Sequence, residues 1–424
     1  MSTIGTFEQV RTAGSEERIS ADFCVIGAGI AGFAAAITLA DLGRSVILVD
    51  AQPQIGGQCV NSLIGLFCGV FGTAPDYDLL TQTVFEDLFR DLEGTGALSH
   101  RYGDTLSVQY DEVTVGRWME KELGKRPRIT VALGAALIAT EGSDGEVSRA
   151  RFASRYGELV VQARGFVDAT GDASLSWLAG FECVLPDGPI YGSQQFRLGG
   201  ISEEHVPTRE EAAAELAAFG DQYGVIRREG IPFVFPGTGT AVINMTHVET
   251  PLGTLASSEA QAAGRDQADR VARFLAERFP RAFGASRITS YGILGRRQTR
   301  WIRGEHTLTD DEVIRGKKFD DSVARTAWPI ELHHRADRHR WEVFGDGHLH
   351  YVPLRSLVPR GSVNVIAAGR CIDAEPAALS SVRVMGPCAA MGAGAAHALD
   401  LMGDGTVGSV NRNDLAERLR RNVG

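Results

Sequence analysis

The sequence predicts an α/β fold in which a parallel sheet forms a nucleotide-binding domain and a smaller α+β domain is inserted into it. Three stretches support this prediction. Residues 22–57 have the pattern strand, glycine turn, helix, strand. The pattern of helices and strands changes between about 186 and 345. From 346 onwards a strand is again followed by a helix of small residues, so the two outer segments are expected to form one discontinuous domain.

The first of these stretches carries the strongest local signal. An apolar run over 23–26 predicts a buried strand, which ends at the turn GAGIAG (27–32), where a helix begins. A second strand over 45–49 ends at Asp50, 18 residues after Gly32. This order of elements is typical of a Rossmann-like unit that binds a dinucleotide. Asp50 is then expected to accept hydrogen bonds from ribose hydroxyls.

Each glycine of the turn has a structural role that a larger residue could not take. Gly27 allows the tight turn, Gly29 lets backbone N–H groups approach a pyrophosphate, and Gly32 lets helix and strand pack closely. The helix begins at Ile30 and Ala31, and its N-terminus carries the partial positive charge that favours an anion. We therefore expect these residues to hold the phosphates of a dinucleotide.

A second glycine pair indicates which dinucleotide binds. Ala51 follows the acid, and Gly56, Gly57 and Gln58 come a few residues later. A strand-end acid followed by a Gly-Gly pair resembles the FAD-binding start of the glutathione-reductase-like flavoproteins. This resemblance implies FAD, since NAD enzymes do not usually need the second pair.

Length, net charge and cysteine content limit the classes to which this protein can belong. A chain of 424 residues suits two or three domains, and a net charge of −10 disfavours nucleic acid as a partner. No apolar run is long enough to span a bilayer, and residues 1–20, expected to be a flexible lead, lack the apolar core of a signal peptide. The six cysteines show neither a paired framework nor zinc spacing, so no metal site is expected and a reduced cytoplasm fits. The oligomeric state stays open.

Further elements follow from periodicity. In the FAD-binding domain (21–185 and 346–424) we expect helices over 76–93 and 112–123, a strand over 128–139 and a hairpin over 146–163. A strand then leads into the turn Ala169-Thr170-Gly171, which is expected to pass close to FAD. In the inserted cap domain (186–345) we expect helices over 206–219 and 257–279, with strands between them over 231–244.

The last segment returns to the cofactor. A strand over 362–370 ends in Ala-Gly-Arg, with Gly369 and Arg370 as its last two residues, and a helix of very small residues covers 386–396. The N-terminus of this helix, aimed at the flavin pyrimidine, would stabilise negative charge on the reduced ring. Arg383 and Met385, just before it, are therefore expected near the flavin.

Together these motifs resemble the FAD-dependent oxidoreductase family related to fumarate reductase flavoproteins. The blocks that carry the resemblance span nearly the whole chain: 25–57, 167–180, 295–313, 327–333 and 351–396. The resemblance implies a flavin-dependent redox step on a small molecule.

Departures from related patterns narrow this expectation. No histidine precedes Gly56, so FAD is expected to be non-covalent. Trp177 stands where aromatic hydroxylases carry arginine, and Ile64 where disulfide reductases carry their second cysteine. The tryptophans never have the spacing used by flavin halogenases. No second glycine turn for NAD(P)H is present, so the electron acceptor is expected to bind transiently or to be oxygen.

The cap region supplies candidate catalytic residues. Glu331 and His333 alternate on an expected strand over 327–333, so both should face one side. His333 is the first choice as base, because imidazole titrates near neutral pH. Arg300, in a cluster with Arg296 and Arg297, is expected to hold an anionic or carbonyl group by a forked pair of hydrogen bonds.

Other roles for these residues remain open. Arg355 is a further candidate at the return to the FAD domain. Structural salt bridges are the alternative for the arginines, and pairing with an arginine is an equal alternative for Glu331.

The function that we expect is a dehydrogenase or oxidase that transfers a hydride between a small polar metabolite and flavin N5. A flavin-dependent monooxygenase and a non-catalytic FAD-binding redox partner subunit are the alternatives. The sequence leaves open the substrate, the direction of the reaction and the electron acceptor.

Overall fold

The protein, seen here as a computed structural model, is described over residues 16–424 except 83, 104 and 231. Its largest sheet has the strand order β6-β2-β1-β9-β8-β7, with β20 also paired to β9. Strands β1, β2, β6, β9 and β20 are mutually parallel, and the β7–β8 and β8–β9 pairs are antiparallel. The strands are β1 (Glu16–Ile26), β2 (Val46–Asp50), β6 (Ile129–Leu133), β7 (Ala136–Ser143), β8 (Glu146–Ser154), β9 (Gly157–Asp168) and β20 (Val365–Ala367).

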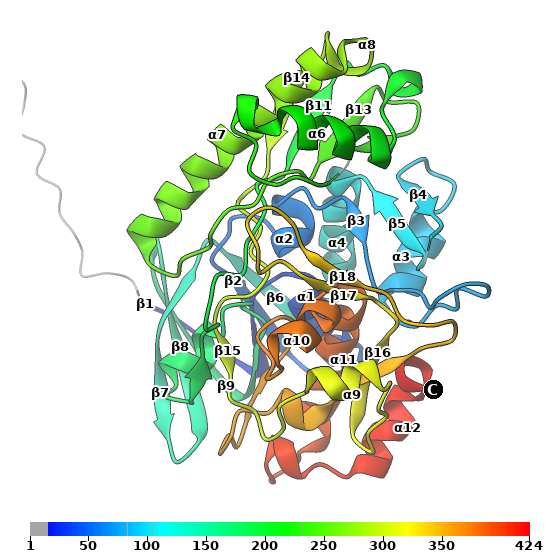
Figure 1. Cartoon of the computed structure of the whole chain (residues 1–424). Coiled ribbons are helices and arrows are strands. Elements are labelled where there is room, and N and C mark those ends of the chain that lie inside the picture. Colours follow the sequence, from blue (N-terminus) through cyan, green and yellow to red (C-terminus); the bar gives the residue numbers. More distant parts are fainter. Residues whose placement is uncertain (1–15, 83, 104, 231) are drawn as a thin grey trace, which may run out of the picture.

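Helices from both ends of the chain pack beside this sheet. Helix α1 (Ile30–Asp41) lies against α11 (Met385–Leu401), and a Cβ on Gly392 of α11 would lie only 2.0 Å from the Ala31 carbonyl oxygen. Both helices are built of small, buried residues, so their backbones approach closely. Figure 1 shows them in the centre of the molecule. Other helices of this part are α2 (Gly57–Asn61), α3 (Val84–Leu92), α4 (Glu112–Gly124), α5 (Ser174–Leu178) and α12 (Arg412–Val423).

A second sheet has a hydrophobic core of its own. Its antiparallel order is β12-β13-β11-β14, and its buried residues, among them Phe196, Leu216 and Phe274, form a separate cluster. In Figure 1 this group lies at the top. Its elements are β11 (Phe196–Gly199), β12 (Pro232–Phe235), β13 (Thr240–Ile243), β14 (Arg287–Tyr291), α6 (Arg209–Tyr223), α7 (Thr254–Arg278) and α8 (Pro280–Phe283).

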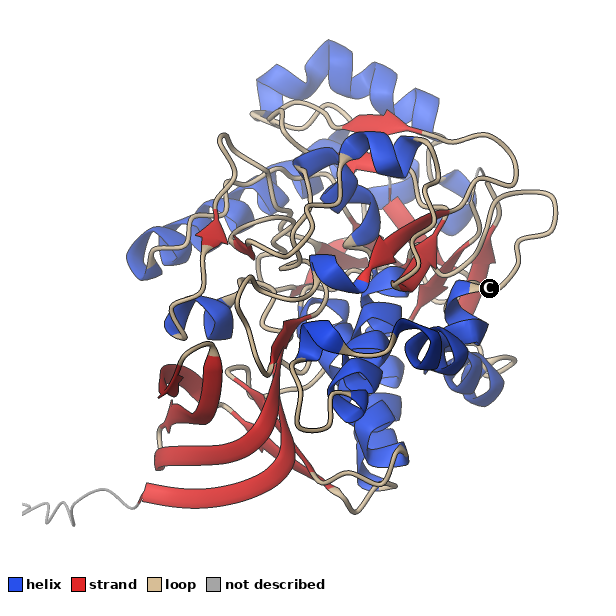
Figure 2. Ribbon diagram, turned by 90° about the horizontal axis from the view of Figure 1, so that it is seen from below, coloured by secondary structure: helices blue, strands red, loops and turns tan. Residues whose placement is uncertain are grey.

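Short sheets and helices complete the fold. Figure 2, the view from below, shows the long strands curving along one edge with helices gathered beside them. The small sheets are β3 (Leu66–Phe67) with β5 (Ser107–Tyr110) and β4 (Leu98–Arg101), β10 (Cys183–Val184) with β15 (Trp301–Ile302), β16 (Ser322–Thr326) with β19 (His350–Pro353), and β17 (Ile330–Leu332) with β18 (Arg340–Glu342). The short helices are α9 (Asp310–Ile314), α10 (Pro376–Val382), η1 (Glu203–His205), η2 (Leu354–Ser356) and η3 (Val407–Ser409).

Several predicted elements are confirmed. The strand, helix and strand around the first glycine turn are β1, α1 and β2, and the hairpin over 146–163 is β8 with β9. The helix over 112–123 is α4, and the helices over 206–219 and 257–279 correspond to α6 and α7. The strands over 231–244 are β12 and β13. The mixed α/β class with a parallel sheet is therefore correct.

Three predicted boundaries are wrong. The helix expected over 76–93 begins only at Val84, because Leu80 N–H donates instead to the Val70 carbonyl at 2.9 Å. The strand expected over 128–139 is divided between β6 and β7 by Gly134, whose φ is +70°. Residues 16–20 of the expected lead belong to β1 and pair with β9, and residues 1–15 lie outside the described chain. Within the described residues no helix combines the length and apolar character needed to span a membrane.

Candidate functional site

The first glycine turn leaves an open cradle at the start of α1. Gly27 has φ +104°, and a Cβ there would lie 2.3 Å from the Ala169 carbonyl oxygen. A Cβ on Gly32 would lie 1.8 Å from the Gly27 carbonyl oxygen. At Gly29 the nearest heavy atom to such a Cβ is 3.9 Å away. The structure therefore confirms the tight turn and the close packing, and leaves space over Gly29 at a helix N-terminus that has no side-chain cap and no acid in its first turn.

Two other turns pack around this cradle. Gly57, in the second glycine pair, has φ +49°, and a Cβ there would lie 2.8 Å from Gly29 Cα. Gly56 N–H donates to the Ala28 carbonyl at 2.8 Å. Gly369, which follows β20, has φ +89°, and its Cβ would lie 3.3 Å from the Ala31 side chain. Backbone from three distant segments thus surrounds one helix start, and this arrangement fits a pyrophosphate.

Asp50 closes one end of the cradle. The residue is 9% exposed, and its carboxylate accepts hydrogen bonds from the N–H groups of Ala28 and, at 2.7 Å, Gln52. Burial raises the pKa of Asp50, although both backbone hydrogen bonds act in the opposite direction. Each oxygen keeps a lone pair, so the carboxylate can still accept from ribose hydroxyls.

We expect Asp50→Ala to weaken FAD binding without removing it. The change removes one charge-assisted hydrogen bond, worth about 1.5–3 kcal/mol, so the affinity should fall by about one to two decades. Titration of the FAD-free protein with FAD, followed by the visible absorbance band, measures this. Asp22→Ala is the matched control, because Asp22 also accepts from a backbone N–H, that of Ser45, which directly precedes β2 at the end of that strand opposite to Asp50. Equal losses in both variants would contradict a contact between Asp50 and the cofactor.

Arg370 turns toward the loop after β9. Its guanidinium lies 2.8 Å from Asp172 Oδ1 and donates to Thr299 Oγ1 at 2.8 Å. A Cβ on Gly171 would lie 2.7 Å from Arg370 Nε, so this approach needs the glycine. Burial would raise the pKa of Asp172, but Arg370 and Thr299 outweigh it and the pKa is lowered. Two turns that were predicted separately as cofactor neighbours therefore lie side by side.

Three other residues predicted to bind the cofactor, Gln58, Thr170 and Ala51, lie in three different environments. Gln58 Oε1 accepts from the Arg296 N–H at 2.6 Å, and this bond joins α2 to the arginine cluster. The Thr170 hydroxyl donates to Asp168 at 2.7 Å, so it holds its own turn. Ala51 is exposed beyond the end of β2.

The start of α11 lies against the loop after β3. Gly386 N–H donates to the Cys68 carbonyl at 3.0 Å. Met385 Sδ is 3.7 Å from the Tyr110 hydroxyl. Arg383 donates to the Glu331 carbonyl at 3.2 Å, and its buried Nε has no hydrogen-bond partner among the described residues. A buried guanidinium N–H without a partner is costly, so this position fits a ligand with an acceptor atom.

Glu331 and His333 meet as the alternation predicts. His333 Nε2 lies 2.9 Å from Glu331 Oε1, and Trp328 Nε1 donates to Glu331 Oε2 at 3.2 Å. The His333 side chain is fully buried, whereas that of Glu331 is 20% exposed. His247, which the sequence did not single out, lies behind them with Nε2 at 2.8 Å from His333 Nδ1.

The buried arginine beside this pair is Arg297. It donates to the Tyr191 carbonyl at 2.7 Å and to Ser193 Oγ at 2.9 Å, and Tyr191 N–H donates to the His333 carbonyl. Burial lowers the pKa of Arg297 well below its usual value, and the charges of Arg383 and Arg227 add to this. Its two acceptors are uncharged, so among the described residues no direct ion pair neutralises its positive charge.

Arg300 and Arg355 lie in other surroundings. Arg300 Nε donates to the Asp172 carbonyl at 2.9 Å, and its guanidinium lies 4.4 Å from the centre of the Trp177 ring. Arg355 makes a two-point ion pair with Asp321 at 2.9 and 3.1 Å, which raises the pKa of Arg355. The described contacts of these two arginines do not include His333 or Glu331.

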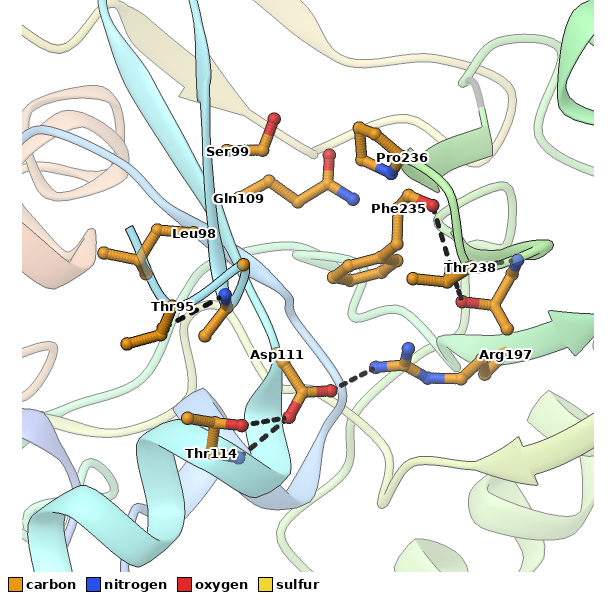
Figure 3. Close-up of a pocket in the computed structure, with 13 residues that line it drawn as sticks. Thr95, Leu98, Ser99, Gln109, Asp111, Thr114, Arg197, Phe235, Pro236 and Thr238 are labelled. Atoms are coloured by element: carbon orange, nitrogen blue, oxygen red, sulfur yellow. Dashed lines mark hydrogen bonds and ion pairs between the residues drawn. The ribbon is translucent and has the colours of Figure 1, made fainter. Parts of the chain in front are cut away.

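A separate cavity of about 440 Å³ lies between the β4–β5 hairpin and the second sheet. In Figure 3 Arg197 points across it toward Asp111, which caps α4 by accepting from Thr114. Arg197 also pairs with the buried carboxylate of Glu112. The cation in this cavity is thus already neutralised, and the residues that line it come from other elements than the glycine turns. Within the described residues, no group of three or more His, Cys, Asp or Glu side chains could hold a metal ion.

Comparison with known proteins gives the family. A family model described as FAD dependent oxidoreductase matches residues 22–419. Putrescine oxidase of Kocuria rosea is 39% identical over 79 residues, which are 18% of this chain and 16% of that protein. Dihydrolipoyl dehydrogenase of Buchnera aphidicola subsp. Schizaphis graminum is 25% identical over 137 residues, 30% of this chain and 26% of that protein. The chain therefore matches only a minor part of the length of these relatives.

Among solved structures, a geranylgeranyl bacteriochlorophyll reductase-like protein from Thermoplasma acidophilum has a TM-score of 0.49 and 13% identity, with 96% of this chain and 82% of that chain covered. For p-nitrophenol 4-monooxygenase from Pseudomonas putida the TM-score is 0.42 and the identity 10%, with the same coverage of 96% and 82%. Because the family model matches nearly the whole chain, the protein belongs to the FAD-dependent oxidoreductases, and FAD is its cofactor.

Proposed function

We propose that this enzyme is a dehydrogenase or oxidase that transfers a hydride between a small polar metabolite and N5 of FAD, the chemistry that this cofactor supplies when bound. In this proposal residues 21–185 and 346–424 form a glutathione-reductase-type FAD-binding domain, and residues 186–345 form a cap that contributes the substrate site. The observation that carries the proposal is the partly buried hydrogen bond between Glu331 and His333, at 2.9 Å, with Arg383 linking Glu331 to the residues before α11.

Proton transfer is assigned to this pair of side chains. Arg383 joins Glu331 to the residues that precede α11, where the flavin ring is expected. Of the two side chains only Glu331 is partly exposed, so its carboxyl group is the one that can reach a substrate. His333, behind it, exchanges a proton with Glu331 through their hydrogen bond. A positioned acid–base group of this kind contributes about 10²–10⁴-fold to a rate.

The charge around the pair favours an anionic substrate. Three buried arginines, Arg227, Arg297 and Arg383, act on His333, and each of them lowers its pKa. The carboxylates among them are Glu229 and Glu331. Positive charge is therefore in excess, and a carboxylate on the substrate would balance it.

Arg297 and Arg383 are better placed than Arg300 to hold such a group. The charges of Arg297 and Arg383 both act on His333, whereas the guanidinium of Arg300 stacks on Trp177 and donates to the Asp172 backbone. For Arg355, whose guanidinium is used by Asp321, we propose a structural role.

Anaerobic mixing of the FAD-loaded enzyme with a panel of small hydroxy and amino carboxylates tests the function. A substrate alone should bleach the visible flavin band. If the enzyme is an oxidase, air should restore the band; if it is a dehydrogenase, only an added electron acceptor should restore it. Reduction by NAD(P)H alone, with labelled oxygen incorporated into an aromatic or apolar substrate, would instead show a monooxygenase. A flavin that no small molecule reduces would show a redox partner subunit.

A further inference from the structure

Glu331 and Trp341 lie opposite each other on two neighbouring strands. Their Cα atoms are partners in the antiparallel pair of β17 and β18. Glu331 N–H donates to Ser380 Oγ at 3.1 Å, and the Glu331 carbonyl accepts from Arg383 at 3.2 Å, so both backbone groups point away from β18. This is the geometry of a pair without mutual hydrogen bonds, in which the two side chains share one face of the sheet and lie closest together.

The Trp341 indole is held in place by other rings. It makes T-shaped contacts with Trp328, at 5.6 Å between ring centres, and with His339, at 5.7 Å. Trp328 Nε1 donates to Glu331 Oε2 at 3.2 Å. His339 stacks on His333 with ring centres 4.9 Å apart, and His333 is bonded to the other oxygen of Glu331. Four rings and one carboxyl group thus form a closed loop of contacts.

Only part of this loop is open to a ligand. His333 and Trp328 are buried, and the side chain of His339 is 12% exposed. The side chain of Glu331 is 20% exposed, and Trp341 is 42% exposed. A molecule that reaches the Glu331 carboxyl group from this face therefore lies beside the indole. Because its neighbours already fix the ring, little conformational entropy is lost when a ligand packs on it.

Positive charge lies on the other edge of β17. Arg383 donates to the Glu331 carbonyl, which points away from Trp341 and its strand, and Arg383 Nε is buried without a hydrogen-bond partner among the described residues. A carboxylate can accept from such a guanidinium by charge-assisted hydrogen bonds. The Glu331 carboxyl group thus stands between a cation on one side and an open aromatic ring on the other.

We propose that the substrate is a 2-hydroxy or 2-amino acid with an aromatic side chain, and that Trp341 is the residue that selects the aromatic ring. The acid group lies toward Arg383, the reacting carbon lies at Glu331, and the ring packs on the open part of Trp341. The identity of the reacting carbon rests on the proposed function. The placement of the two ends rests on the pairing of β17 with β18 and on the exposure of the indole.

Titration calorimetry of the oxidised, FAD-loaded enzyme with unreactive acids tests the proposal without turnover. Phenylacetate and cyclohexylacetate have the same number of carbon atoms, but only the flat ring of phenylacetate can pair with an indole. Such a pair adds affinity beyond the area that it buries, so phenylacetate should bind about 2–12-fold more tightly. Phenylacetamide has the same shape without the charge, and it should bind about 10–100-fold more weakly than phenylacetate.

Trp341→Leu tests where the aromatic ring binds. The change keeps an apolar side chain on β18 and removes the indole, so the preference for phenylacetate over cyclohexylacetate should disappear. A general disturbance of the site would weaken both acids alike and leave the ratio of their dissociation constants unchanged. The matched control is Trp177→Leu, which removes another exposed indole, stacked on Arg300, and should keep this ratio.

Three results would overturn the proposal. The first is equal affinity of the wild type for phenylacetate and cyclohexylacetate, a measurement that needs no variant to fold. The others are a preference that Trp341→Leu leaves unchanged, and phenylacetamide binding as tightly as phenylacetate. If one of these occurs while an aliphatic hydroxy or amino acid reduces the flavin, the proposed function stands and the aromatic substrate class is wrong. If the preferences are as expected but no hydroxy or amino acid reduces the flavin, the proposed function is wrong and the recognition of an aromatic acid stands.

Discussion

Gly29→Val is expected to give a folded protein that purifies without FAD. The backbone at Gly29 has φ −70° and ψ −179°, which any residue adopts, and a Cβ there meets no atom closer than 3.9 Å. The branched side chain would instead fill the space that the pyrophosphate needs over the start of α1. Loss of two charge-assisted hydrogen bonds, each worth about 1.5–3 kcal/mol, lowers FAD affinity by about two to four decades.

The measurement is the FAD content after purification, with thermal unfolding as the check on folding. Acid precipitation of the wild type should release yellow FAD into the supernatant, because no covalent bond to the protein is expected. Gly188→Val is the matched control, since this glycine also faces open space and should accept valine with full occupancy. Normal FAD content in Gly29→Val would contradict the cradle, and colour that stays with the acid precipitate would contradict non-covalent binding.

The second large effect is expected in His333→Gln, which should keep FAD and slow its reduction by substrate about 10²–10⁴-fold. Glutamine can occupy the buried position and still form a hydrogen bond to Glu331, but it cannot exchange a proton in the way that imidazole does. Stopped-flow absorbance under anaerobic conditions gives the rate constant for reduction. The dissociation constant for substrate should change little, because the arginines remain in place.

A comparison with His397→Gln separates chemistry from stability. His397 is a partly buried histidine in α11, where burial lowers its pKa to about 4. Its replacement should cost stability and leave the reduction rate of the folded fraction unchanged. If His333→Gln behaves in the same way, His333 is structural and Glu331 must exchange the proton without it.

Backbone features of the cofactor cradle could be predicted because few residues satisfy them. Only glycine fits at Gly27, where φ is +104°, and at Gly32, where a Cβ would overlap the Gly27 carbonyl, so the spacing in the sequence determines the turn. Strands β1 and β2 followed from their apolar runs in the same way. The prediction that the cofactor is FAD was correct for the same reason. The contacts of individual residues with FAD and substrate stay predictions.

Features that depend on tertiary contacts could not be predicted. Leu79 and Leu80 have helical spacing with Val84. In the structure, however, Leu79 forms an antiparallel β-bridge with Phe71, and Leu80 N–H donates to the Val70 carbonyl. His247 follows β13 by four residues and is 86 positions from His333, so no spacing in the sequence connects the two. Arg297 and Arg300 are equivalent by composition, and only the packing of 191–193 around Arg297 distinguishes them.

The close contact between α1 and α11 also determines when this protein can fold during its synthesis. The apolar side of α1 is made early, but the backbone that covers it, at Gly392, is made about 360 residues later. In the same way, β9 is made long before β20, the parallel strand that pairs with it. Contacts this distant in sequence form slowly and only once the intervening chain exists. A ribosome-bound chain that ends before α11 therefore exposes the alanine side of α1, and it lacks the helix start that we propose to lie beside the flavin.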